Sequence, residues 1–267
     1  MEGEKLRITH DGWEIIRYEE NTPIRKQDTL AVELPLTIQL NGHEFATMVC
    51  SPSDLADLVC GFLASEGIIY TLDELQELSI DIERGFAYVT LNRTIDPKKY
   101  DQSKRFIGSC CGKSRQFYFK SDVRTAKTIR HALTITPSAC YHLMNEMQAM
   151  SNIFHQTGNM HNAALCTVDK ILFMRHDIGR HNALDKIYGS IIRNRLSVRD
   201  KVIVFSGRVS SEVLLKISKI GVGILLSKSA PTDLAIKLAN DLGITVAGFI
   251  RGEKMNVYSH SKRIVND

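Results

Sequence analysis

The sequence predicts an α/β protein, α+β overall, in two parts. The first is a smaller β-rich domain with one helix over residues 1–135, and the second is a domain over residues 136–267 in which helices cover both faces of a mixed sheet. The length of 267 residues suits one large domain or two modest ones. Alternating segments joined by turn residues fill the first part, whereas short apolar runs alternate with segments of helical period in the second.

The composition narrows the class of protein. Hydrophobic residues make up 43% of the chain and the net charge is +4, which excludes a disordered chain. This charge is too small to indicate nucleic acid, although it suits a bound polyphosphate or dinucleotide. The charged N-terminal segment does not resemble a secretory signal, and no apolar run approaches the ~18 residues of a membrane span. We therefore expect a cytoplasmic protein that binds neither nucleic acid nor membrane.

The N-terminal part shows two hairpins around a helix. Alternating residues from Leu30 to Cys50 flank Asn41-Gly42, the dipeptide that favours a type I′ turn. The segment 51–54, Ser-Pro-Ser-Asp, supplies a helix cap and a proline for the first helical position, and we expect that helix to end near Gly67. A second hairpin is expected over residues 77–92.

The C-terminal part alternates between the two periods. We expect helices over four segments: 136–155, 179–194, 210–220 and 231–242. We expect strands over five short apolar runs: 162–168, 170–176, 201–208, 221–230 and 243–250. Such alternation indicates parallel or mixed strands covered by helices.

The cysteines do not follow the spacing of a zinc site or a disulfide framework. They are Cys50, Cys60, Cys110, Cys111, Cys140 and Cys166. The chain contains no C-x-x-C and no H-x-x-x-H, so we expect reduced thiols and no zinc. All except the adjacent pair lie in apolar patterns typical of packing residues.

The adjacent thiols, Cys110 and Cys111, lie in a polar segment over residues 93–116 that has no sustained period and is expected to be a mobile functional loop. Lys113 and Arg115 would favour a thiolate there, because a nearby cation lowers a thiol pKa. Cys110 and Cys111 are therefore the candidate catalytic residues, as carriers of a transferable atom. The alternatives are a pair exposed without function and a strained vicinal disulfide.

A second group of candidate residues surrounds the turn between a predicted strand and the helix at 179–194. Asp177, Arg180 and His181 lie where backbone N–H groups can hold an anion. His161 precedes another strand and could reach the same edge of the sheet. The alternative is structural, with Asp177 capping the helix and His181 pairing with Asp185 one turn later.

A third group occupies three successive strand ends, which together predict a crevice for a polar, phosphate-bearing ligand. Its members are small, hydroxyl-bearing or basic for the most part: Ser206, Gly207, Arg208, Ser229, Thr232, Phe249, Ile250, Arg251, Gly252, Glu253 and Lys254. The chain has neither a Walker A nor a G-x-G-x-x-G loop, so ATP hydrolysis and hydride transfer are not expected.

Several ordered blocks resemble the FdhD family of accessory sulfurtransferases: CGFLASEGII, GSCCGKSR, TGNMHNAAL, DIGRHNALDKIYG, FSGRVSSEVLLK, SKSAPTDLAIKLA and GFIRGEKMNVYSH. The resemblance covers nearly the whole chain. It implies an enzyme that takes persulfide sulfur from a cysteine desulfurase and passes it to the molybdenum bis(molybdopterin guanine dinucleotide) cofactor, before that cofactor enters formate dehydrogenase. The segment 249–254 matches the family's cofactor-binding segment.

The resemblance also implies a C-terminal three-layer domain like that of cytidine deaminases, but not their chemistry, because the chain lacks H-x-E and P-C-x-x-C. Many family members carry C-x-x-C where this chain has Gly108-Ser109-Cys110-Cys111-Gly112, so either thiol is a candidate. Other interpretations are a non-catalytic chaperone for the cofactor and a nucleoside hydrolase that uses His161 and Asp177. A homodimer is compatible with the sequence.

Overall fold

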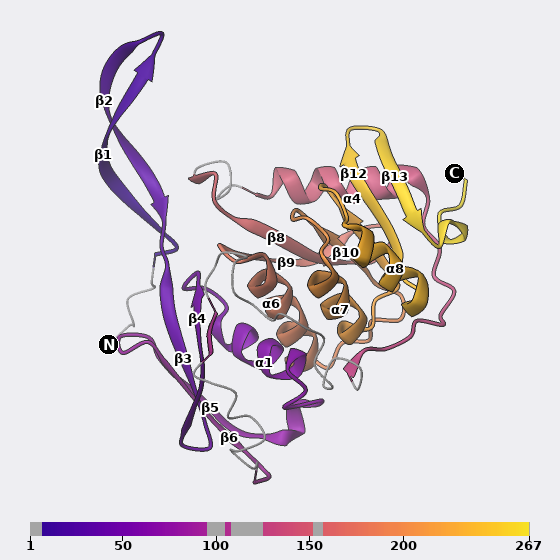
Figure 1. The fold of residues 1–267 in the computed structure, drawn as a ribbon, viewed down its shortest axis with the longest axis horizontal. Helices are drawn as coiled ribbons and strands as arrows, with labels where there is room; N and C mark the ends of the chain where they lie inside the picture. Colours follow the sequence, from indigo (N-terminus) through magenta and orange to yellow (C-terminus); the bar gives the residue numbers. More distant parts are fainter. Residues whose placement is uncertain (1–6, 95–104, 108–124, 152–156, 267) are drawn as a thin grey trace.

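A computed structural model describes residues 7–94, 105–107, 125–151 and 157–266, and it contains two larger sheets and a separate two-stranded hairpin (Figure 1). Within these residues, no helix has both the length and the apolar character needed to cross a membrane. The predicted α+β class is confirmed.

The C-terminal part contains a six-stranded sheet in the order β13-β12-β11-β10-β8-β9. Its strands are β8 (His161–Cys166), β9 (Ile171–Asp177), β10 (Val202–Phe205), β11 (Ile224–Ser227), β12 (Thr245–Arg251) and β13 (Lys254–Ser259). Strands β10, β11 and β12 run parallel to one another, and the remaining pairings are antiparallel. The sheet is therefore mixed, as predicted, and all five predicted strands are present.

Helices cover both faces of this sheet because its strands are buried on both sides. Along β10, Val202 and Val204 contact one apolar cluster, which includes residues of α4 (Pro137–Ala149). Ile203 and Phe205 point into the other cluster, which includes residues of α6 (Arg180–Arg193), α7 (Ser211–Ile220) and α8 (Asp233–Leu242). This alternation follows from the two-residue period of a strand and confirms the predicted layers.

The N-terminal part contains a five-stranded sheet in the order β5-β6-β3-β4-β7. Its strands are β3 (Leu34–Leu40), β4 (His43–Cys50), β5 (Leu75–Asp81), β6 (Phe86–Leu91) and the short β7 (Arg105–Ile107). Positive φ angles at Asn41 and Gly42, 49° and 81°, give the predicted type I′ turn between β3 and β4. Strand β7 pairs with β4 inside the segment in which we expected no regular structure.

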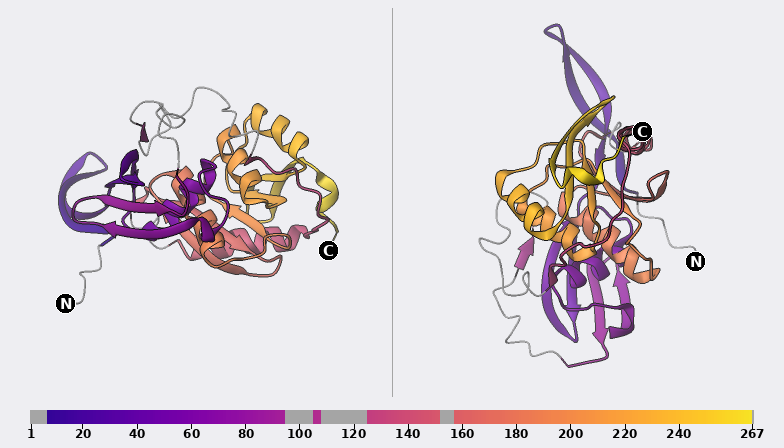
Figure 2. Two further views of the ribbon diagram at one scale, coloured as in Figure 1. Left: turned by 90° about the horizontal axis from the view of Figure 1, so that it is seen from below. Right: turned by 90° about the vertical axis from the view of Figure 1, so that its right-hand side faces the viewer.

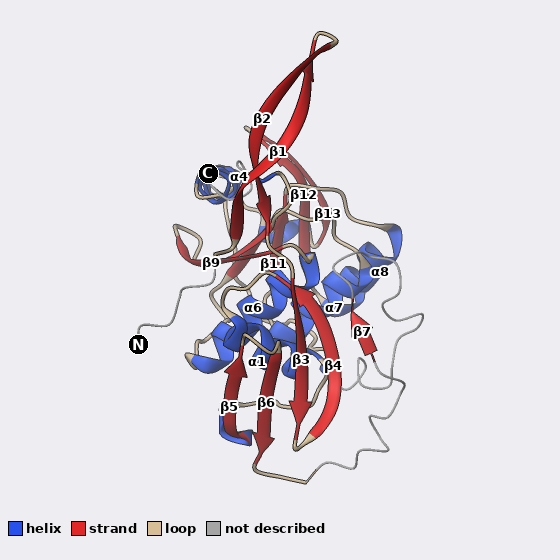
Figure 3. Ribbon diagram, turned by 90° about the vertical axis from the view of Figure 1, so that its left-hand side faces the viewer, coloured by secondary structure: helices blue, strands red, loops and turns tan. Residues whose placement is uncertain are grey.

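Helix α1 (Leu55–Ser65) lies against this sheet and ends as predicted near Gly67, which has a φ of 71° (Figure 3). Its start differs from the prediction. The helix is preceded by Asp54, with a φ of 49° and no side-chain cap, so neither Ser51 nor Pro52 serves the helix start. The backbone N–H of Ser51 instead donates to Asp177 at 3.0 Å, and this long-range contact takes the place of the expected local cap.

Helices α1 and α6 cross at very short range. A Cβ atom on Gly189 would lie 1.8 Å from the carbonyl oxygen of Asp57, and one on Gly61 would lie 1.8 Å from that of Asp185. Only glycine permits this approach of two backbones. One apolar cluster includes residues of β3, β4, α1, α6 and α7, so the core continues across the predicted boundary at residue 135.

The third sheet is a hairpin of β1 (Thr9–Glu19) and β2 (Thr22–Ala31), which we call the arm. Positive φ angles at Glu20 and Asn21, 48° and 68°, form its two-residue turn. The arm projects away from both larger sheets in all views (Figures 1 and 2). The sequence analysis made no prediction for these strands.

Candidate functional site

A pocket of about 300 Å³ opens at the edge of the C-terminal sheet where β10 and β11 end and β8 begins. It brings together four of the residues predicted from the sequence: His161, Ser206, Ser229 and Arg251. They come from four different strands or strand ends. The prediction that polar strand ends converge at one edge is therefore confirmed for these residues.

The pocket also has lining residues that the sequence analysis did not select. Lys228 lies beside Ser229 in the same strand-end segment, so its position could have been inferred from that neighbour. Gln148 and Asn159 have no such signal, because the last turn of α4 and the segment before β8 reach the pocket only through tertiary packing. The lining is thus richer in amides and cations than predicted.

Hydrogen bonds between neighbouring strand ends fix the floor of the pocket. The backbone N–H of Asn162 donates to the Ser206 hydroxyl at 2.9 Å, and the Ser229 hydroxyl donates to the Ser206 carbonyl at 3.0 Å. The Ser227 hydroxyl donates to the carbonyl of Gly207 at 2.9 Å. These serines hold β8, β10 and β11 in register at the site, in addition to any contact with a ligand.

A cationic cluster continues from the pocket at His161. Burial lowers the pKa of His161, and the nearby His181 and Arg208 lower it further, although Asp177 acts in the opposite direction. Burial also lowers the pKa of Arg180, with a further contribution from Arg208. The site therefore gathers four nitrogen-bearing side chains whose charges repel one another, an arrangement that an anion would stabilise.

The predicted pair of His181 with Asp185 does not form, and that part of the structural alternative is wrong. His181 Nε2 instead lies 3.2 Å from the carboxylate of Glu212 on α7. Asp185 accepts a hydrogen bond from Ser65 at 2.6 Å and pairs with Lys216. Partners on packed helices have replaced the one-turn spacing within α6. Burial nevertheless keeps the pKa of His181 below its usual value, with the Glu212 contact opposing the shift.

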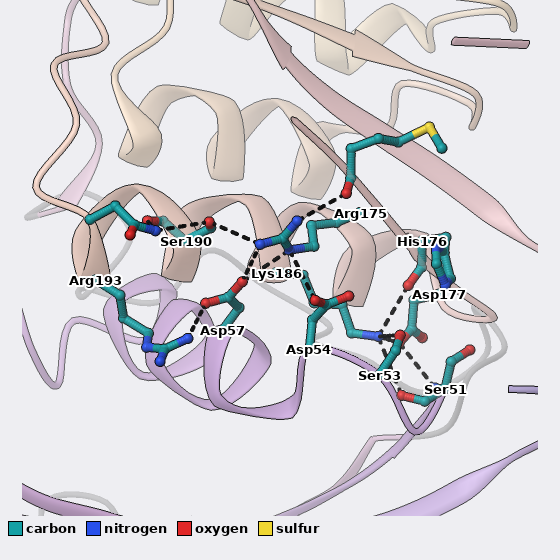
Figure 4. A network of polar contacts seen from close by, with 12 residues as sticks. Ser51, Ser53, Asp54, Asp57, Arg175, His176, Asp177, Lys186, Ser190 and Arg193 are labelled. Carbon is teal, nitrogen blue, oxygen red and sulfur yellow. Dashed lines mark hydrogen bonds and ion pairs between the residues drawn. The ribbon is translucent and has the colours of Figure 1, made fainter. Parts of the chain in front are cut away.

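Asp177 is completely buried, and its carboxylate does not line the pocket (Figure 4). One oxygen accepts from the Gly179 N–H at 2.8 Å and from Asn182 at 2.9 Å. The other accepts from Ser51 N–H at 3.0 Å and lies 2.7 Å from Lys186 Nζ. The carboxylate holds the start of α6, as the structural alternative proposed, and it also ties that helix to the N-terminal part.

The same network contains charged residues that the sequence analysis did not identify. Lys186 is fully buried, and its ammonium also donates to the backbone carbonyl of His176 at 3.1 Å. Asp57 on α1 accepts from Arg175 at 2.7 Å and from Arg193 at 2.6 Å (Figure 4). These ion pairs join strand β9 and helix α6 to the segment around α1.

The predicted segment 249–254 forms the hairpin between β12 and β13. Arg251 lines the pocket, Ile250 is buried in the core, and Phe249 is 41% exposed with a positive φ of 55°. A positive φ on a bulky residue is strained and recurs at functional sites.

The other members of the predicted site do not line the pocket. Gly252 and Glu253 form the hairpin turn, Lys254 begins β13, and Thr232 caps α8 by accepting from Ala235 N–H. Cys110 and Cys111 lie outside the described residues, as does most of the loop assigned to residues 93–116.

Together, the fold and the site define an α+β protein whose C-terminal mixed sheet carries a polar pocket lined by cations at its strand ends. The model of the FdhD/NarQ family matches residues 31–265, and the chain belongs to this family. It is 55% identical over 251 residues to the sulfur carrier protein FdhD of Geobacillus kaustophilus, an alignment that covers 94% of this chain and 95% of that protein.

Two further comparisons support this assignment. The sulfur carrier protein FdhD of Bacillus subtilis is 54% identical over 263 residues, and the alignment covers 98% of each chain. A crystal structure described as a putative formate dehydrogenase accessory protein from Desulfotalea psychrophila matches with a TM-score of 0.79. That match covers 97% of this chain and 100% of the other, and at 24% identity it speaks for the fold alone.

Proposed function

We propose that this chain is a sulfurtransferase that carries sulfur for formate dehydrogenase. In this proposal Cys110 or Cys111 receives sulfur from the persulfide of a cysteine desulfurase. The sulfur then passes to the molybdenum bis(guanine dinucleotide) cofactor while that cofactor is bound in the pocket. The names of the curated relatives support the role of sulfur carrier, and the similar crystal structure, described as that of a formate dehydrogenase accessory protein, supports the link to formate dehydrogenase.

The observation that carries the proposal is the burial of every described cysteine. Cys50, Cys60, Cys140 and Cys166 are at most 1% exposed. Burial raises the pKa of Cys50 and of Cys166 to about 12, and that of Cys60 to about 11. Thiol exchange needs an accessible thiolate, so none of these three can serve. Cys110 and Cys111 are the cysteines that remain.

The first transfer step needs no outside oxidant or reductant. The acceptor thiolate attacks the terminal sulfur of the donor persulfide, the donor S–S bond breaks, and the donor cysteine leaves as a thiolate. The acceptor then holds the same sulfane sulfur in a new S–S bond. Release of that sulfur as sulfide reduces the bond by two electrons, which a second thiol supplies as it forms a disulfide.

The pocket supplies groups that suit the nucleotide end of the cofactor. Lys228 and Arg251 are cationic partners for phosphate, and the amides of Gln148 and Asn159 can both donate and accept hydrogen bonds. His161 joins the pocket to the cluster that contains Arg180 and Arg208, a second position for negative charge.

The test is mass spectrometry of the loop peptide after incubation of the protein with a cysteine desulfurase and labelled cysteine. We expect one added sulfur on Cys110 or Cys111, and loss of that mass in the matching Cys→Ser variant. Cys140→Ala serves as the control because this thiol is buried, and it should keep the added sulfur. A Cys110→Ser, Cys111→Ser double variant that still matures formate dehydrogenase would refute the proposal.

The pocket also favours a second candidate function, that of a cofactor chaperone without sulfur chemistry. Under this alternative Arg251→Ala abolishes binding of guanosine diphosphate and maturation together, whereas the two loop thiols are dispensable. Under the leading proposal, the loop variants lose maturation but bind the nucleotide with unchanged affinity. Titration calorimetry with guanosine diphosphate, combined with the maturation assay, therefore separates the two functions.

A further inference from the structure

The arm exposes apolar surface far from the pocket. Five of its large hydrophobic side chains are at least 42% exposed: Trp13, Ile16, Tyr18, Ile24 and Leu30. Its two strands pair only with each other among the described residues. A two-stranded ribbon of this kind is marginally stable in water, and exposed strand edges are templates for pairing with another chain. The arm therefore has the properties of an interaction surface.

The edge of β2 is better suited to pairing than the edge of β1. A bulge between His10 and Trp13 interrupts β1, whereas β2 keeps its register from Thr22 to Asp28. In a hairpin closed by a two-residue turn, the residues that flank the turn form a hydrogen-bonded pair. The even-numbered residues of β2 thus bond to β1, and the odd-numbered ones direct their N–H and C=O groups to the free edge. Pro23, which has no N–H, lies on that free side.

The charges along β2 select one antiparallel pairing with a second copy of the same strand. A two-fold axis places one residue opposite itself. An axis at Arg25, Lys26 or Asp28 would bring two like charges together, which is unfavourable across a strand pair. An axis at Gln27 places two neutral amides opposite each other.

The register centred on Gln27 also pairs the neighbouring residues favourably. Lys26 then lies opposite Asp28 of the second copy, and because of the symmetry this ion pair occurs twice. Ile24 lies opposite Leu30, which brings two exposed apolar side chains together, again twice. Gln27 faces the free edge with its backbone groups, as a hydrogen-bonded pair requires.

We propose that β2 pairs with β2 of a second copy in this register, so that two arms form one four-stranded antiparallel sheet. The tip of each arm then reaches the base of the other. The proposal assigns a surface and a register to the homodimer with which the sequence is compatible, and it does not depend on the function proposed above.

Charge substitution on the arm of the full chain tests the register. We expect sedimentation velocity to show a dimer for the wild type, and Lys26→Asp or Asp28→Lys alone to weaken it by at least about tenfold, because each places like charges opposite one another twice. An equimolar mixture of the two variants should recover the dimer, since each altered position then meets the opposite charge. Arg17→Asp is the matched control on β1 and should leave the dimer unchanged.

Three outcomes would overturn the proposal. A wild-type chain that stays monomeric at all concentrations would show that the arm serves a different protein. A dimer that Lys26→Asp leaves intact would place the contact elsewhere on the molecule. Single variants that weaken the dimer without recovery in the mixture would exclude this register.

Discussion

Replacing Lys186 with methionine should strongly destabilise the chain. Its ammonium and the carboxylate of Asp177 are both 0% exposed and lie 2.7 Å apart. Methionine fills much of the same volume but leaves the carboxylate as a buried charge that retains only neutral donors. Breaking a buried pair on one side costs about 3–5 kcal/mol. For a chain of this size, that loss lowers the unfolding midpoint by ~10 °C.

Urea unfolding followed by circular dichroism measures this loss. Lys237→Met is the matched control, because Lys237 pairs with Asp233 on the exposed face of α8 and its loss should barely move the midpoint. A second variant, Lys186→Met with Asp177→Asn, removes the buried charge and should recover part of the stability. If Lys186→Met unfolds at the same urea concentration as the wild type, the buried pair does not join the two parts as described.

Three further predictions concern packing and protonation. Gly189→Ala should prevent stable folding or lower the unfolding midpoint sharply in a thermal melt, because the new methyl group would lie 1.8 Å from the Asp57 carbonyl oxygen and the helices must separate. Burial lowers the pKa of His176, so the unfolded chain binds more protons below the ordinary value near 6.5; stability should therefore fall as the pH drops from about 7 to about 5.5, and His176→Gln should reduce that slope in urea titrations. Gly207→Ala would place a methyl group 2.8 Å from the Phe205 ring and 3.3 Å from His161 Nδ1, so it should weaken binding of guanosine diphosphate by about tenfold in calorimetry; unchanged affinity would show that the position of the His161 ring does not matter for binding.

Local patterns predicted most of the elements because local physical chemistry determines them. The type I′ turn at Asn41-Gly42 needs positive φ at both residues, which these residue types accept readily. The arm was missed for the same reason. Its turn uses Glu20 and Asn21, and Glu20 carries no turn signal. Strand β13 was missed because Gly252 was assigned to a binding segment and not to a hairpin turn.

The candidate site was predictable only in part because its contacts join distant segments. Strand ends placed His161, Ser206 and Ser229 at one edge, and the structure brings them into one pocket. The partner of His181 could not be predicted in this way. Asp185 lies one helical turn away, whereas Glu212 reaches the imidazole only because α7 packs beside α6. Sequence spacing describes neighbours on one helix and carries no information about the next.

The block DIGRHNALDKIYG combines two roles that its sequence pattern does not separate. Asp177 and Lys186 form the buried pair that anchors α6 to the N-terminal part. Arg180 and His181, on the first turn of the same helix, contribute to the cationic cluster next to the pocket. Because one rigid helix carries both sets, the contact between the two parts of the chain also fixes where these cations lie. A motif with several charged residues can therefore mark the position of a helix as much as the chemistry of a site.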